Sequence, residues 1–99
     1  MSLMEELLAQ FEEEVEGVSE YSRCAKAAKD DPELQKMYTE MAAAELDHAR
    51  RLQQQLEKRA AEPVEPEQAV IVLQQIRAAQ QKDMDEKMAK ARACLSMLK

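Results

Sequence analysis

The sequence contains a single histidine, His48, and a glutamate, Glu45, precedes it by three positions. Residues three apart lie on the same face of an α-helix, so both side chains can reach one centre. Another glutamate, Glu14, interrupts an apolar row earlier in the chain. Carboxylate oxygen and imidazole nitrogen form a ligand set that suits Fe, Mn or Zn. These three residues are therefore candidate metal ligands and candidate catalytic residues.

The composition predicts helices as the elements that position these residues. The chain has 99 residues, one glycine, 3% aromatic and 34% charged residues. This composition excludes a β-sandwich or a glycine-rich nucleotide loop, and the length allows one domain. No stretch reaches the roughly 18 consecutive apolar residues that would span a bilayer. We predict an all-α protein with no membrane segment.

Two groups of residues mark the expected helix boundaries. In Asp30-Asp31-Pro32, an aspartate can cap a helix that has proline at its first position. Pro63 and Pro66 lie in a polar stretch that interrupts the chain again. The expected helices span about residues 3–29, 32–60 and 67–97.

These boundaries predict three segments: an antiparallel helical hairpin in residues 1–60, a linker at 61–66 and a third helix within 67–99. The apolar row of the third helix is interrupted by Gln80 and Gln81. The sequence does not decide whether this helix covers the hairpin or builds a larger oligomer.

The register of the hairpin follows from the position of its turn. Because both helices rise about 1.5 Å per residue, Glu14 should face Glu45 and Phe11 should face His48. The polar interruptions of the two rows then fall in one layer, with Tyr21 one layer away. The expected inward rows are Met4, Leu7, Phe11, Glu14, Val18, Tyr21 and Ala25 in the first helix, and Leu34, Tyr38, Met41, Glu45, His48 and Leu52 in the second.

Burial of two carboxylates and an imidazole together would cost several kcal/mol without a compensating charge, so a bound cation is expected. Di-iron bundles use a lone Glu from each of two helices and Glu-x-x-His from each of two others. One hairpin supplies half of this set, and a two-fold pair of hairpins supplies all of it. We therefore expect at least a homodimer.

Several of these motifs resemble the ferritin-like superfamily. They are the spacing of Glu14 and Tyr21, the segment Asp31-Pro32-Glu33-Leu34, and the segment Glu45-Leu46-Asp47-His48-Ala49. Within the superfamily, they are most similar to the rubrerythrin-like or encapsulated-ferritin type. The resemblance covers roughly residues 10–56.

The resemblance implies a ferritin-like four-helix bundle that is completed by dimerisation, with a di-iron centre shared between two subunits. The ligands that it implies are Glu14, Glu45 and His48. Tyr21 would be a hydrogen-bond donor beside the ligands, and Glu13 and Glu16 would be outer acidic groups or a peripheral metal site. The implied activity is that of a ferroxidase-type or peroxidase-like oxidoreductase, which oxidises Fe(II) with O2 or peroxide.

Partners and location are also expected from the sequence. The net charge of −6 argues against nucleic acid as a partner. Two widely separated cysteines and an N-terminus without a signal pattern favour a cytoplasmic protein. The resemblance also suggests an encapsulin-like shell as a partner, but the tail Ala91–Lys99 contains no recognisable targeting peptide, and no rubredoxin-type CxxC pair is present.

Two alternatives remain open. The chain could be a non-catalytic helical oligomerisation module in which the Glu/His layer only specifies the register. It could instead hold Mn or Zn as a structural site without redox turnover.

Overall fold

The protein is a bundle of three long helices. The computed structural model describes the backbone of residues 3–60 and 67–98 and the side chains of residues 3–59 and 77–98. These residues form α1 (Leu3–Ala27), α2 (Pro32–Ala60) and α3 (Glu67–Ser96), with no strand among them. The predicted all-α class is confirmed. The expected linker, 61–66, lies outside the described residues.

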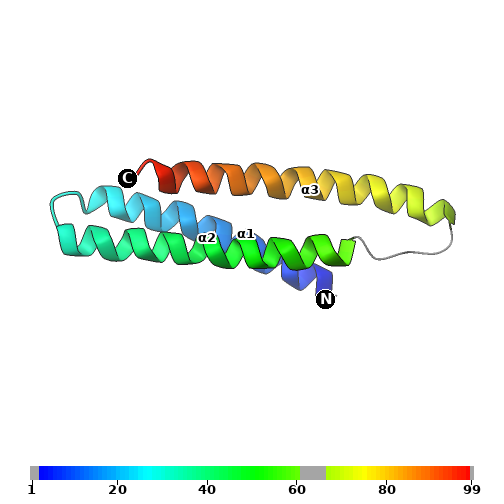
Figure 1. Cartoon of the computed structure of the whole chain (residues 1–99), viewed down its shortest axis with the longest axis horizontal. Coiled ribbons are helices and arrows are strands. Elements are labelled where there is room, and N and C mark those ends of the chain that lie inside the picture. The colour runs from blue at the N-terminus through cyan, green and yellow to red at the C-terminus, as the bar shows by residue number, and fades with distance from the viewer. Residues whose placement is uncertain (1–2, 61–66, 99) are drawn as a thin grey trace.

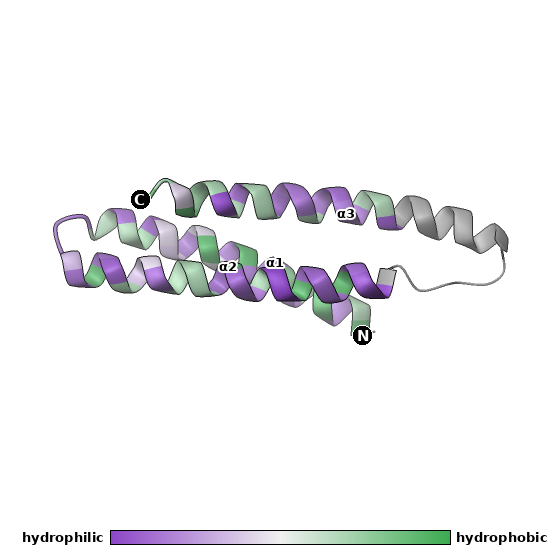
Figure 2. Cartoon of the chain, viewed as in Figure 1, coloured by the Kyte–Doolittle hydropathy of each residue, from purple (hydrophilic) through white to green (hydrophobic). Residues whose placement is uncertain are grey.

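The three helices lie side by side in a rod of 59 × 21 × 17 Å (Figure 1). α1 and α2 form the antiparallel hairpin, and α3 packs against both of them. Hydrophobic and hydrophilic residues are interleaved along α1, α2 and the described part of α3 (Figure 2). No helix in the described part of the chain is long and apolar enough to cross a membrane.

The turn between α1 and α2 fixes the register of the hairpin. Asp31 caps α2, because its Oδ1 accepts a hydrogen bond from the backbone N–H of Leu34 at 3.1 Å. Across the turn, Nε2 of Gln35 donates to the carbonyl of Ala25 at 3.0 Å. α1 ends at Ala27, earlier than expected, and the chain reverses between that residue and Asp31.

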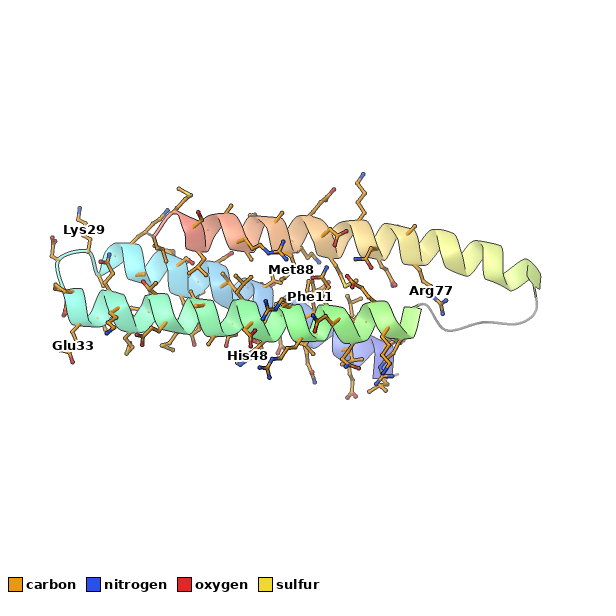
Figure 3. The ribbon with its side chains drawn as sticks, viewed as in Figure 1. Phe11, Lys29, Glu33, His48, Arg77 and Met88 are labelled. Carbon is orange, nitrogen blue, oxygen red and sulfur yellow. The ribbon has the colours of Figure 1, made fainter. Side chains whose placement is uncertain are left out.

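The hydrophobic core lies between the hairpin and the second half of α3. Its members are Phe11, Val15, Val18, Ala42, Ala49, Leu56, Met84, Met88, Ala91 and Leu95. Figure 3 shows Phe11 and Met88 between α3 and the hairpin, with His48 on the side of α2 away from α3. The third helix therefore covers one face of the hairpin and leaves the other face open.

This asymmetry shows that the predicted inward rows were wrong in part. In α1 the buried line passes through Val15 and Ser22, while Glu14 and Tyr21 are only half-buried. In α2 the most buried positions are Ala42, Ala49, Gln53 and Leu56, whereas Leu34 and His48 are exposed. The reason is that α3 contributes core residues on one side only.

Polar contacts hold α3 against the hairpin. Nζ of Lys87 donates to Oε1 of Glu12 on α1 at 2.9 Å. Nε2 of Gln53 on α2 donates to Oδ1 of Asp85 at 3.0 Å, so this buried amide has a partner. These bonds fix how α3 is placed, which the apolar pattern alone left undecided.

Truncation of Met88 tests whether α3 is part of the folding core. Met88 is 1% exposed, so Met88→Ala should lower the free energy of unfolding by about 2–5 kcal/mol, through lost burial and a cavity. Met97, which is 69% exposed, provides the control, and Met97→Ala should stay within about 0.5 kcal/mol of the wild type. Urea unfolding followed by circular dichroism measures both. Equal effects of the two substitutions would contradict this packing.

Candidate metal centre

α1 and α2 bring two carboxylates and an imidazole into one cluster. One ligand atom from each of Glu14, Glu45 and His48 lies within 4.8 Å of the others. Nδ1 of His48 is 3.4 Å from Oε2 of Glu14 and 3.6 Å from Oε1 of Glu45. The predicted pairing of Glu14 with Glu45 therefore brings these side chains together, as the sequence indicated. The predicted pairing of Phe11 with His48 is wrong, because Phe11 packs toward α3 whereas His48 lies on the side of α2 away from α3 (Figure 3). The role of Glu14, Glu45 and His48 as metal ligands stays a prediction.

The cluster lies at a half-buried position on the open face of the hairpin. The side chains of Glu14 and Glu45 are 27% and 26% exposed, and that of His48 is 51% exposed. The expected burial of all three groups is therefore wrong for a single chain. Water reaches the cluster because α3 packs on the opposite face.

Within the part of the chain that the structure describes, neither carboxylate is paired with a lysine or arginine. The neighbouring Arg50 and Arg51 are both paired with Asp47 instead. Oε2 of Glu14 is buried and has no hydrogen-bond partner. Among the described residues, the imidazole of His48 is the one nitrogen-bearing side chain within 4 Å of both carboxylates.

The close approach of the two carboxylates changes the proton affinity of one of them. The pKa of Glu45 is raised above 4.5, first because Glu45 can share a proton with Glu14 and then because it is partly desolvated. The negative charge of Glu14 raises this pKa further, while His48 opposes the shift. A bound cation would take the place of the shared proton.

The sequence analysis missed Gly17. It lies one turn after Glu14, and its backbone faces the carboxylate of Glu45. The available signal was that the chain's sole glycine occurs within a helix.

Tyr21 lies one layer nearer the turn than the cluster. Its ring stacks on that of Tyr38, with centroids 6.3 Å apart and an angle of 25° between the planes. This contact agrees with the register derived from the sequence. A hydrogen bond from Tyr21 to a metal ligand remains a prediction.

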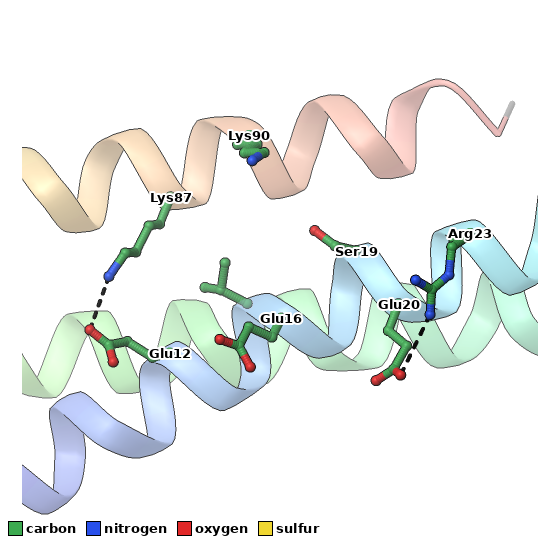
Figure 4. Close-up of a pocket in the computed structure, with 8 residues that line it drawn as sticks. Glu12, Glu16, Ser19, Glu20, Arg23, Lys87 and Lys90 are labelled. Atoms are coloured by element: carbon green, nitrogen blue, oxygen red, sulfur yellow. Dashed lines mark hydrogen bonds and ion pairs between the residues drawn. The ribbon is translucent and has the colours of Figure 1, made fainter.

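Glu13 and Glu16 do not join the cluster. Glu13 is exposed, and Glu16 lines a separate cleft of about 650 Å³ between α1 and α3 (Figure 4). Basic residues also line that cleft, and Lys87 there is paired with Glu12. The role of Glu13 and Glu16 as outer acidic groups or a peripheral site remains a prediction.

The residues of the cluster fit a metal ion. Two carboxylates and one imidazole supply the donor atoms that iron, manganese and zinc accept. The buried Oε2 of Glu14 has no hydrogen-bond partner, and the pKa of Glu45 is raised chiefly by its neighbour Glu14, as expected where two carboxylates meet without a cation between them. A divalent cation would neutralise this pair of charges.

A helical hairpin that places a carboxylate from one helix beside a Glu-x-x-His pair on the next is the arrangement found in di-iron bundles of the ferritin-like class. A protein-family model described as Rubrerythrin matches residues 5–93, and the chain belongs to this family. The predicted family resemblance is thereby confirmed. The family is one of di-iron carboxylate proteins and typically binds iron. No curated protein and no solved structure matches the chain.

The raised pKa of Glu45 predicts how the stability of the metal-free protein depends on pH. The unfolded chain ionises Glu45 near 4.5, whereas the folded chain holds its proton to higher pH. Stability should therefore increase as pH falls through the raised pKa, because the folded state binds the extra proton. At pH values above the raised pKa, the ionised Glu45 destabilises the fold.

Glu45→Gln should remove this pH dependence and raise the melting temperature of the metal-free protein at neutral pH. Thermal melts from neutral pH down to 4.5 measure the difference from the wild type. Glu13→Gln, at an exposed position on α1, is the control. Parallel pH profiles for wild type and Glu45→Gln would contradict the assignment.

Proposed function

We propose that the chain binds iron between two copies of itself and oxidises Fe(II) with O2 or peroxide, as a ferroxidase or peroxidase-like enzyme. The observation that supports this most is the facing pair of carboxylates, Glu14 and Glu45, with the imidazole of His48 beside both of them. Membership in a family of di-iron carboxylate proteins supports the choice of iron.

A second copy would complete the site. One hairpin contributes two glutamates and one histidine, and a di-iron bundle uses twice this set from four helices. Leu34 and Met37 are exposed large hydrophobic residues. Each precedes a cluster residue of α2, Glu45 or His48, by eleven positions, which is about three helical turns and places them on the same face. Two-fold pairing through this face would bury them and bring the two clusters together, because an isologous interface places the same surface on both subunits.

Each residue of the cluster has a proposed role. Bound iron would supply the electrons: two Fe(II) ions would give two electrons, which with two protons reduce O2 to hydrogen peroxide, or hydrogen peroxide to two water molecules. Glu14 and Glu45 would hold the metal and favour Fe(III), since their negative charge stabilises the more positive ion. His48 would bind as a neutral imidazole and fix one position on each metal. Tyr21 would hold the ligands in place by a hydrogen bond.

Removal of Glu45 tests the proposed chemistry. Glu45→Ala should lower the amount of iron bound per chain and slow Fe(II) oxidation by at least about tenfold, as expected when metal-site interactions are lost. Anaerobic Fe(II) titration gives the stoichiometry, and stopped-flow absorbance after mixing with O2 or peroxide gives the rate. Glu86→Ala, at an exposed position on α3, should leave both unchanged.

If Glu45→Ala leaves iron binding and oxidation at wild-type values, the proposed function is wrong. If metal binding depends on Glu45 but no oxidation occurs in the wild type, the site is a structural Mn or Zn site instead.

Assembly provides an independent test. If the metal bridges two copies, metal binding stabilises the dimer by mass action, so a chelator should shift the protein toward monomer. Analytical ultracentrifugation with and without chelator, together with elemental analysis, measures this shift. A dimer that forms equally well without metal would favour the non-catalytic oligomerisation module.

A further inference from the structure

Gly17 is the chain's sole glycine and lies in the interior of α1. Glycine is unfavourable inside a helix relative to alanine, because it loses more backbone freedom on folding. It follows Glu14 by three positions, so the two residues share a face of α1. Because Gly17 destabilises α1, we expect a feature of the surrounding structure that requires a glycine at this position.

The reason lies on α2. A Cβ atom added at Gly17 would lie 2.7 Å from Oε2 of Glu45 and 3.3 Å from its Cδ and Cγ. The three nearest atoms thus all belong to Glu45, and none belongs to the backbone of α2. Gly17 therefore makes room for one carboxylate, rather than for a close approach of the two helix backbones.

The same carboxylate points its other oxygen toward the cluster. Oε1 of Glu45 is 3.6 Å from Nδ1 of His48, while Oε2 faces Gly17. The carboxylate is therefore held between the α1 backbone and the imidazole. Its end is flexible, so a methyl group at position 17 would displace the carboxylate rather than separate the helices.

We propose that Gly17 is a positioning residue for the metal site. The missing side chain keeps open the space in which the Glu45 carboxylate faces Glu14 and His48. This inference rests on the proposed function, in which Glu45 is a metal ligand.

Gly17→Ala tests the inference because it should weaken metal binding without destabilising the fold. The metal-free variant should melt at the wild-type temperature or a few degrees higher, since alanine favours the helix. Its affinity for Co(II) and for anaerobic Fe(II) should fall by roughly 10–100-fold, the range found when residues that orient metal ligands are changed. The visible absorption of bound Co(II) should also change, because the ligand set is altered.

Ser19→Ala is the matched control on the same helix. Ser19 lines the cleft between α1 and α3, and its substitution also favours the helix. Co(II) affinity and absorption should stay at wild-type values in this variant. A crystal structure of metal-free Gly17→Ala should show the Glu45 carboxylate displaced.

A double-mutant cycle shows whether the effect acts through Glu45. In a Glu45→Ala background, Gly17→Ala should cause no further loss of Co(II) affinity, because the carboxylate is already absent. An equal loss in both backgrounds would overturn the inference, as would an undisplaced Glu45 carboxylate.

Metal binding by the wild type distinguishes a failure of the Gly17 inference from a failure of the proposed function. If the wild type binds Co(II) and Fe(II) and Gly17→Ala binds them equally well, Gly17 has no positioning role while the proposed function stands. If the wild type binds neither metal, the proposed function fails and this inference fails with it.

Discussion

The structure depends on one electrostatic constraint, which is that two carboxylates from different helices are held side by side. Glu14 and Glu45 share the imidazole of His48, and the nearby arginines are paired with Asp47. Such a pair is unfavourable in a folded protein unless protons or cations compensate the charge. In the metal-free chain, contact with water lowers the cost of the two charges, and protonation of the pair removes this cost as pH falls.

The incomplete burial of the cluster follows from the same constraint. A single chain keeps these groups partly in contact with water, where the cost of their charge is small. If a second copy covered the open face, it would remove that water, and the need for a cation would increase. The metal and the partner chain would then be needed at the same time, which links the proposed chemistry to the proposed assembly.

The hairpin and its register could be predicted from the sequence because they follow from local rules. An aspartate cap, a proline and a constant rise per residue are sufficient to place Glu14 opposite Glu45. The position of α3 could not be predicted in this way. The core of α2 consists largely of small residues such as Ala42 and Ala49, which give only a weak hydropathy signal.

The polar contacts of α3 could not be predicted from the sequence either. Gln53 and Asp85 are ordinary surface residue types, and nothing in the spacing of one predicts its partner on another helix. Gly17 was visible as an unusual residue in a helix, but its neighbour was not. Pairwise contacts of this kind depend on the three-dimensional packing, which the periodicity of a single helix does not contain.

The core and the cluster lie on opposite faces of the hairpin, because α3 covers one face only. Residues such as Met88 pack in the core toward α3, away from the exposed face that carries His48 (Figure 3), and energetic effects at well-separated positions are generally additive. The metal preference of such a protein could diverge through changes on one surface while its thermal tolerance evolved through changes on the other.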